Sequence, residues 1–488
     1  MARRLGDRPN ILWIFADELR ADALGCYGGG LGPTHTPNID RLAAAGTLFR
    51  NHFCNSTVCV SSRTSILTAT PPQENGVHGN EGAWASFPLP VRLDTFPEFF
   101  ARHGWRTATL GKSHVPKDYK PWQAENHDGA SMHGFGLDTD PAGRAPIVPQ
   151  GIPSPVGGVF PDRAFFPPEA VTINAIDWLD AAGDQPFLLR VSYLQPHTPV
   201  LPPARFRKMF RAEDYPGHDI PRADQSAFDD AFAAMVGGRE LTHEQMRRAQ
   251  ADYHALVAWL DVQIGMVLAK LDMMGLRENT IVVLDADHGA SLGENGLLSK
   301  IVFAPQSQRV PRIVSWPGHV PEGAVRDDIA QSMDLARTLC HLAGVTPFDG
   351  FRGRALFSDP APEAIFASVG SGAKTSRASA ASNKGIWRSG AGWPRRGCIR
   401  TDRWRLDMNI RIDGGTVPPG EKDIFLADWR ADPHERRNLA ADPAHAAVRA
   451  DLESQLTSFV ARSLEPDFIP VFSTAESPEF LPPRIAKS

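Results

Sequence analysis

Two short apolar runs, far apart in the chain, end directly in acidic residues. The first covers residues 10–16 and is followed by Asp17 and Glu18, and the second covers residues 280–284 with Asp287 just beyond it. Continuous apolar runs of this length are typical of parallel strands that are buried on both faces. A chain with such strands has to cover its sheet with helices on both sides.

Further strands and helices alternate between these two runs. Strand patterns occur at residues 107–110 and 187–193, and helical patterns start at residue 36 and cover residues 95–103, 170–182 and 242–273. Strands that alternate with helices predict an α/β fold with a largely parallel sheet. Ligands of such sheets bind beyond the carboxyl ends of the strands. The polar side chains that follow the strands are Asp17, Lys112, His197 and Asp287.

The remaining segments predict loops and a second unit. Residues 119–166 and 198–240 are rich in Gly, Pro and Asp, and we expect surface loops there, with a local helix over 224–235. The later segments are a Ser/Gly/Ala-rich mobile loop at 368–393, a strand at 398–410 and a helix at 447–462. We therefore predict an α/β domain over 1–350, a smaller α+β subdomain over 351–463 and an extended tail over 464–488 that wraps over this chain or a partner.

Composition excludes several classes of function. The net charge is −5 and no basic stretch dominates, so we expect no nucleic-acid partner. Residues 1–8 are charged, the apolar run after them is too short for a signal segment, and no segment reaches about 20 apolar residues. We therefore expect a cytoplasmic protein that does not bind membranes. Five sparse cysteines predict neither a disulfide framework nor a zinc site.

One cysteine stands four positions before an arginine, in Cys59-Val60-Ser61-Ser62-Arg63. The residues that follow can continue a helix, whose first turn would offer free backbone N–H groups to a tetrahedral oxyanion. Taken alone, a buried structural cysteine beside a surface arginine is the commoner arrangement. A cysteine phosphatase is excluded, because that chemistry needs five residues between the cysteine and the arginine.

The acids at the strand ends predict a metal site. Asp17, Asp287 and His288 offer two hard oxygen ligands and one nitrogen, which suits a divalent cation with an open coordination position. The alternative is that Asp287 and His288 only cap the turn that follows their strand.

Four basic side chains could flank a nucleophile. Lys112 and His114 follow a strand, His197 lies between two prolines, and Lys300 lies twelve residues beyond His288. A lysine can act as an electrostatic clamp and a histidine as an acid or base near neutral pH. Each of these residues alone is more often a solvated loop residue, so their combination is what favours a site.

The order of these segments resembles the type I sulfatases of the alkaline phosphatase superfamily, whose nucleophile motif is Cys-x-Pro-Ser-Arg. The matching segments are residues 9–17, 36–40, 59–63, 111–114, 196–199 and 287–300, with closing motifs at 423–428 and 432–439. The resemblance covers nearly the whole chain. It implies a mixed, mostly parallel sheet sandwiched by helices, with a smaller C-terminal α+β subdomain.

The resemblance also implies the chemistry. Cys59 would be oxidised to formylglycine by a formylglycine-generating enzyme, and its hydrate would attack the sulfur or phosphorus of a small-molecule ester. Asp17, Asp287, His288 and the modified Cys59 would hold one divalent metal ion, calcium or manganese. Arg63 and Lys112 would orient the formylglycine, and His114 would accept a proton. His197 and Lys300 would bind the transferred group. Asn80 would donate a hydrogen bond to the substrate, and His78 is a weaker candidate for this role.

Two positions depart from the family pattern. Ser61 stands where the family usually has proline. Glu18 stands where many sulfatases have the second of two paired aspartates, and its side chain either turns away from the metal or ligates it. The segment around Glu18 looks closest to the choline sulfatase and phosphonate monoester hydrolase group. We expect a sulfate monoester hydrolase, with a phosphonate monoester or phosphodiester hydrolase as the alternative. A third reading is an inactive binding protein of the same fold, and the extended tail predicts a homo-oligomer.

Overall fold

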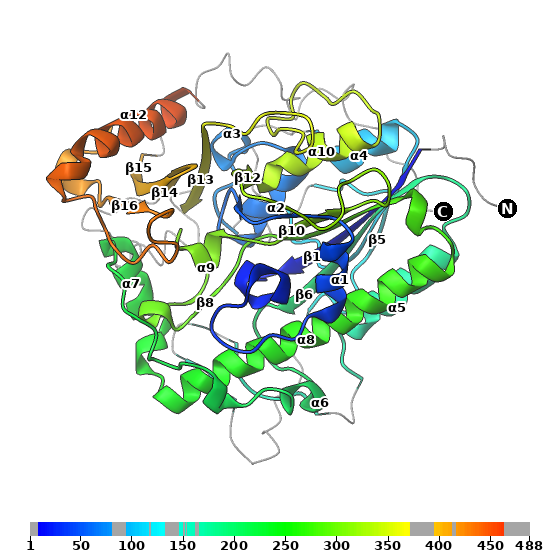
Figure 1. Ribbon diagram of the computed structural model, residues 1–488, viewed down its shortest axis with the longest axis horizontal. Helices are drawn as coiled ribbons and strands as arrows, with labels where there is room; N and C mark the ends of the chain where they lie inside the picture. Colours follow the sequence, from blue (N-terminus) through cyan, green and yellow to red (C-terminus); the bar gives the residue numbers. More distant parts are fainter. Residues whose placement is uncertain are drawn as a thin grey trace.

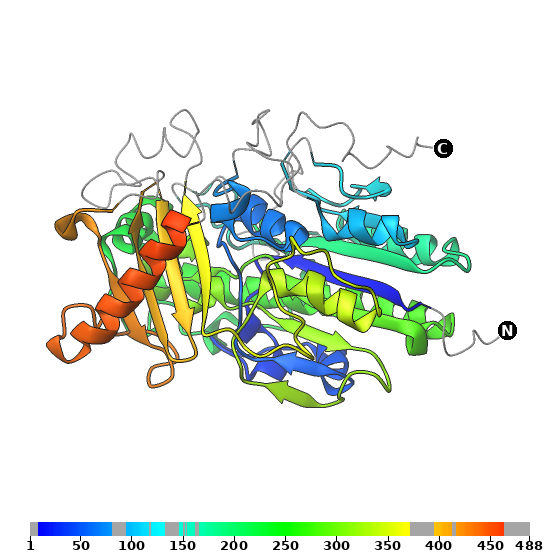
Figure 2. The same cartoon turned by 90° about the horizontal axis from the view of Figure 1, so that it is seen from above.

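Two sheets dominate the protein (Figure 1). The computed structural model describes residues 8–80, 94–116, 119–131, 146–149, 152, 154–161, 165–370, 395–411 and 416–462. An eight-stranded sheet forms the centre of the fold, and a four-stranded antiparallel sheet lies beside it, as Figure 2 shows from above. The predicted fold class is confirmed.

The central sheet is mixed and mostly parallel. In spatial order its strands are β11 (Ala324–Arg326), β2 (Thr47–Phe49), β10 (Arg312–Ser315), β7 (Thr280–Ala286), β1 (Asn10–Asp17), β6 (Phe187–Pro196), β4 (Arg106–Gly111) and β5 (Ala124–Asn126). β1 pairs in parallel with both β6 and β7, and β10 alone runs antiparallel to its two neighbours. The apolar runs at residues 10–16 and 280–284 are therefore adjacent strands at the middle of the sheet.

Helices cover both faces of this sheet. Every residue of β1 is buried, and alternate side chains enter two different cores: Ile14 belongs to one and Trp13 to the other. The first core is closed by α1 (Pro37–Ala44), α5 (Glu169–Asp180) and α8 (His243–Met273), and the second by α2 (Cys59–Thr68), α4 (Phe96–Arg102) and α10 (Leu335–Leu342). Burial on both faces explains why the strands are continuously apolar.

Helix α8 is the longest in the described part of the chain. Its cap is Thr242, whose side chain accepts a hydrogen bond from the backbone N–H of Gln245. By length and composition alone the helix could cross a membrane, but 67% of its most apolar 18-residue window is buried inside the protein.

Two segments that were predicted to be loops contain short elements. The described part of 119–166 includes β5, which extends the central sheet beside β4. The segment 198–240 contains α6 (Ala204–Arg207) and α7 (Ala227–Val236), and α7 confirms the local helix expected there. The remaining short elements are α3 (Pro72–Asn75), α9 (Pro305–Gln308), β3 (His52–Phe53), β8 (Ser291–Leu292), β9 (Leu298–Ser299) and β12 (Ala330–Gln331).

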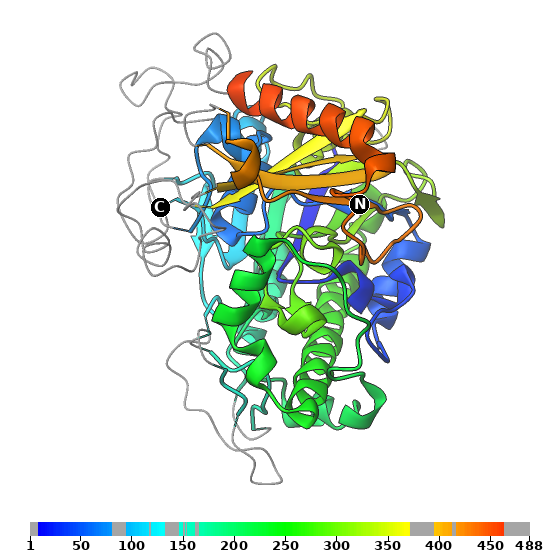
Figure 3. The same ribbon diagram turned by 90° about the vertical axis from the view of Figure 1, so that its left-hand side faces the viewer.

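The C-terminal sheet corrects one prediction. Its strands are β13 (Ala364–Gly370), β14 (Arg395–Thr401), β15 (Trp404–Ile410) and β16 (Phe425–Asp428), and α12 (Ala446–Arg462) packs across them (Figure 3). The single strand expected at 398–410 is two strands, because Asp402 and Arg403 turn the chain back on itself. Of the predicted mobile loop, residues 371–393 lie outside the described residues, as does the tail 464–488.

Candidate active site

The carboxyl ends of the central strands gather the predicted side chains. Asp17 is the last residue of β1 and Asp287 follows β7, and the parallel pairing of Ala16 with Ala286 brings the two acids together. Lys112 follows β4 and His197 follows β6 at the same edge. The position of these four residues agrees with the expectation for a parallel sheet.

Helix α2 brings Cys59 to this edge. Cys59 is the first residue of the helix, and all ten of its residues are buried. The Ser62 hydroxyl donates a 2.6 Å hydrogen bond to the Asp287 carbonyl, which fastens the helix to the end of β7. The backbone N–H of Val60 donates to Asn80 Oδ1 at 3.0 Å. The first turn of α2 is therefore held over the strand ends from two sides.

Four buried side chains form a group suited to a metal ion. One ligand atom from each of Asp17, Cys59, Asp287 and His288 lies within 4.8 Å of the others. His288 Nε2 is 3.2 Å and Asp17 Oδ1 is 3.6 Å from Cys59 Sγ. Two carboxylates and one imidazole fit a divalent cation such as calcium or manganese. Asp17, Glu18 and His197 form a second such group beside the first.

Arg63 holds the two aspartates. Its buried guanidinium donates from Nε to Asp287 Oδ2 and from Nη2 to Asp17 Oδ2, both at 2.9 Å. Burial alone would lower the pKa of Arg63, but Asp287 and Asp17 raise it, so the group stays charged. The resemblance implied that Arg63 orients the nucleophile. In the structure Arg63 contacts the two carboxylates that lie beside Cys59.

Cations surround the Cys59 sulfur. Lys300 Nζ donates to Sγ at 2.8 Å, and the His114 side chain also hydrogen-bonds to Cys59. Burial would raise the pKa of the Cys59 thiol, but Lys300 and the other cations hold it well below its usual value. Burial, and then the charge of Lys112, lower the pKa of His114 to about 4, so its imidazole is neutral near pH 7.

Glu18 joins the two residues expected to bind the transferred group. Its Oε1 lies 2.7 Å from Lys300 Nζ and 3.7 Å from His197 Nε2, and it accepts a 3.3 Å hydrogen bond from Ser299. Burial would raise the pKa of Glu18, but His197 and Lys300 lower it. Its backbone has a φ of 61°, a left-handed conformation uncommon outside glycine. The sequence left the direction of this side chain open.

Comparison with known proteins identifies the family. The sulfatase family profile matches residues 9–345, more than half of the chain. The chain belongs to the sulfatase family.

Three relatives show how far this similarity extends. Iduronate 2-sulfatase of Mus musculus is 30% identical over 64% of this chain, and the chain spans 60% of that relative's length. The multifunctional alkaline phosphatase superfamily protein PehA of Trinickia caryophylli is 26% identical, with 93% of this chain and 95% of the relative covered. The crystal structure of a phosphonate monoester hydrolase of Agrobacterium radiobacter has a TM-score of 0.75 at 23% identity, covering 94% of this chain and 96% of the other, and so shares the fold.

Asn80, a predicted substrate-binding residue, and His78, a weaker candidate, both have structural contacts. The side-chain oxygen of Asn80 accepts a hydrogen bond from the backbone N–H of Val60 in α2. The predicted role in substrate binding did not include this contact. His78 is buried, and its Nδ1 lies 3.0 Å from the hydroxyl of Ser368 in β13. Both residues therefore help to hold the helix or the C-terminal sheet in place.

Sequence reasoning missed two hydroxyls that support the candidate active site. Ser62 binds the carbonyl of Asp287, and Ser192 donates to the carbonyl of Lys112 at 2.6 Å. Ser192 also accepts from Arg63 Nη1 at 3.3 Å. Ser62 stands at the serine of the nucleophile motif, but nothing in the sequence indicates its partner or that of Ser192, because these contacts join residues that are far apart in the chain. Only the folded sheet could reveal them.

Proposed function

We propose that this sulfatase-family chain is a metal-dependent hydrolase of small-molecule sulfate monoesters that uses a formylglycine hydrate made from Cys59. The position of Cys59 carries the proposal. It is fully buried at the start of α2, its sulfur lies among the Asp17, Asp287 and His288 ligand atoms, and Lys300 contacts it directly. A purely structural cysteine has no need of a lysine donor and a group of metal ligands around its sulfur.

The donor set fits a calcium or manganese ion. Asp17, Asp287 and His288 would hold it together with the modified Cys59. Bound there, the ion would stabilise negative charge on the nucleophile and on the transferred group.

The other side chains have separate tasks. Lys300, 2.8 Å from the sulfur, and His197 would bind the oxygens of the transferred group and assist the leaving alcohol. Lys112, which forms an ion pair with Asp17, would orient the nucleophile. His114 is neutral and contacts Cys59, so it can accept a proton at that position.

We further propose that a formylglycine-generating enzyme is a transient partner of this chain. We also propose a cytoplasmic location. A homo-oligomer is proposed from the composition of the tail.

Mass analysis of the tryptic peptide 51–63 tests the nucleophile. Replacing SH₂ by O at Cys59 lowers the peptide mass by about 18 Da. We expect the modified peptide in active preparations and loss of hydrolysis in Cys59→Ala. An unmodified peptide together with full activity in Cys59→Ala would show that the mechanism is wrong.

A phosphonate monoester or phosphodiester hydrolase is the second candidate. Glu18 in place of the family's second aspartate favours it, as does the fold shared with a phosphonate monoester hydrolase. Comparing kcat/KM for an aryl sulfate and for the matching aryl phosphonate monoester separates the two. A higher value for the phosphonate would reverse the assignment. If Cys59 stays a thiol and neither ester is hydrolysed, the inactive binding protein is the correct reading.

A further inference from the structure

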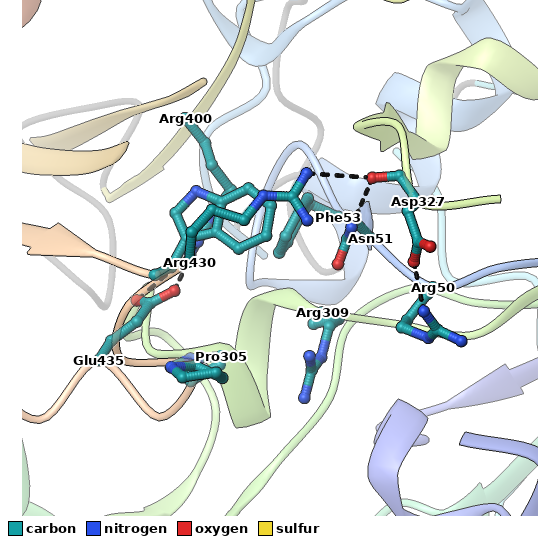
Figure 4. Close-up of a pocket in the computed structure, with 11 residues that line it drawn as sticks. Arg50, Asn51, Phe53, Pro305, Arg309, Asp327, Arg400, Arg430 and Glu435 are labelled. Atoms are coloured by element: carbon teal, nitrogen blue, oxygen red, sulfur yellow. Dashed lines mark hydrogen bonds and ion pairs between the residues drawn. The ribbon is translucent and has the colours of Figure 1, made fainter. Parts of the chain in front are cut away.

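A cavity of about 320 Å³ lies between the N-terminal α/β unit and the C-terminal sheet (Figure 4). Its walls come from β3, from α9 and from the loop after β16, and Phe53 and Trp429 form its aromatic part. None of the residues placed in the active site lines it. Junctions between structural units are common places for small-molecule sites.

The lining is strongly basic. The charged lining residues are Arg50, Arg309, Arg400, Arg430, Asp327 and Glu435. Four guanidiniums and two carboxylates give the cavity a net charge of plus two, although the whole chain carries −5. A cavity with this net charge attracts anions.

One of the two carboxylates is already shared between two arginines. Glu435 binds Arg400 Nη1 at 2.5 Å and also pairs with Arg405, and all three side chains are buried. This carboxylate is therefore already paired, and Asp327 is the other acidic residue that lines the cavity.

The other cations that line the cavity are incompletely compensated. Asp327 pairs through its carboxylate with Arg50 at 2.5 Å. Arg430 donates only to carbonyl oxygens, those of Asp402 at 2.6 Å and Asp327 at 3.2 Å, which are neutral acceptors. Within the described residues, the Arg309 side chain makes neither an ion pair nor a hydrogen bond, and it bears no dashed line in Figure 4.

Aromatic rings support two of the guanidiniums. Arg430 Cζ lies 4.3 Å from the centre of the Trp429 ring, and Arg400 Cζ lies 4.3 Å from the centre of the Phe53 ring. Stacking restrains the plane of a guanidinium and leaves its edge available to an oxyanion. Arg430 is thus held in place for binding, whereas the donors of Arg400 are already taken by Gln308, Glu435 and the Phe303 carbonyl.

We propose that this cavity binds a small molecule that carries two sulfate or sulfonate groups. Guanidiniums are the preferred partners of such oxyanions, because they offer paired N–H donors. The net charge of plus two matches two singly charged groups. The volume of about 320 Å³ lies at the lower end of the range for small-molecule pockets and leaves room for the framework that joins the groups. The assignment does not depend on the hydrolytic activity.

Calorimetry with benzene-1,3-disulfonate on the full chain tests the site. We expect saturable binding whose Kd rises at least tenfold in the double variant R309A/R430A. The matched control is R211A, which removes an arginine whose side chain is 73% exposed away from the cavity, and it should leave the Kd unchanged. Lys300→Ala alters the active site and should also leave this Kd unchanged.

Three outcomes would overturn the assignment: an unchanged Kd in R309A/R430A, loss of binding in Lys300→Ala, or equal affinity for benzenesulfonate, which has one anionic group. Circular dichroism and the unfolding temperature show whether the double variant is folded. Arg309→Gln gives a second measurement that stability confounds less, because within the described residues this side chain makes neither an ion pair nor a hydrogen bond that could be lost, although its charge also lowers the pKa of Asp22. It must still raise the Kd at least threefold.

Discussion

At the scale of single residues, Arg63 explains how two buried aspartates coexist. Asp17 and Asp287 each bind the same guanidinium at 2.9 Å. Around them, the carboxylates of Asp17, Glu18 and Asp287 are balanced by the fixed cations Arg63, Lys112 and Lys300. The charges of the site are therefore compensated within the protein, which limits the cost of burying them.

We predict that removal of the metal ion lowers stability without unfolding the protein. Dialysis against EDTA should lower the unfolding temperature, and Ca²⁺ or Mn²⁺ should restore it, because a ligand of the native state stabilises by about 2.7 kcal/mol at a hundred times its Kd. Differential scanning calorimetry measures the change. Asp287→Asn is the control and should lose the response to EDTA. An EDTA response of unchanged size in that variant would contradict the proposed ligand set.

Ser61 is the third residue of α2, a position at which the helix accepts either serine or the proline that is usual in the family. The N–H of a third helical residue has no partner within the helix, so a proline there removes no helical hydrogen bond. Ser61→Pro loses the 2.6 Å hydrogen bond from its hydroxyl to the Val77 carbonyl. We predict that the free energy of unfolding falls by about 1 kcal/mol, measured in urea.

Ser62→Pro is the matched control for that change. The Ser62 N–H donates to Val58 at 2.8 Å and its hydroxyl to Asp287, so the control loses both contacts and should be destabilised by about 3 kcal/mol or more. If both variants lost the same free energy of unfolding, position 61 would not tolerate proline better than position 62.

At the scale of elements, Asn80 and α2 act as a unit. The Asn80 oxygen accepts from Val60 at 3.0 Å and so satisfies a donor in the first turn of the helix. We predict that Asn80→Ala lowers the free energy of unfolding by about 1 kcal/mol, whereas Asn80→Asp keeps the acceptor and the stability. Asn80→Asp should nevertheless raise KM for an aryl sulfate, because it replaces an amide donor by a negative oxygen. An unchanged KM would limit Asn80 to its contact with the helix.

Long buried strands could be predicted from the sequence, whereas short ones could not. β1, β6 and β7 lie at the predicted positions because burial on both faces requires continuous apolar runs. β10 has four residues and begins with Arg312, which is buried only because it pairs with Asp285 at 2.6 Å. Nothing in the local pattern indicates that pairing.

The same limit applies to the site. Asp17, Lys112, His197 and Asp287 could be placed because each follows a strand, and the carboxyl ends of parallel strands meet at one edge. The contact of Glu18 with Lys300 could not be placed. This contact depends on left-handed backbone conformations at Glu18, Ser299 and Ile301. None of these residues is a glycine, so the sequence does not indicate a left-handed conformation there.

At the scale of the whole molecule, α7 joins the two sheets. The backbone N–H groups of Ala227 and Phe228 donate to the Asp423 carboxylate at 2.8 and 3.0 Å. Phe228 also shares a core with Val369 and Cys398 of the C-terminal sheet. The smaller sheet is therefore attached to the α/β unit by a common core and by a helix cap supplied from the other unit.

Asp229 in α7 makes this junction sensitive to pH. Burial, and then the nearby Asp407, raise the pKa of Asp229 from 3.8 to about 6. A raised pKa means that the folded protein holds the Asp229 proton more tightly than the unfolded protein does. The stabilisation is therefore complete below the pKa of Asp229 in the unfolded protein, and it is lost as the pH rises through the pKa of Asp229 in the folded protein. We predict that, between about pH 4 and pH 7, the free energy of unfolding of the wild type falls by up to about 3 kcal/mol relative to that of Asp229→Asn.

Urea unfolding at several pH values measures this difference. Asp230→Asn is the control, because the neighbouring side chain is 61% exposed and should follow wild type. Parallel curves for wild type and Asp229→Asn would contradict the prediction.

The complete burial of Cys59 sets an order of events during synthesis. An enzyme cannot reach a side chain that is closed in by α2 and the strand ends, so any modification has to act on the nascent chain before the sheet forms. Asp287 leaves the ribosome roughly 230 residues after Cys59, which at ordinary rates of translation takes about 10 to 45 s. Because β7 is an inner strand of the sheet, this delay is the interval in which the thiol stays accessible. Faster translation or a slower modifying enzyme would leave a larger share of molecules closed around an unmodified cysteine.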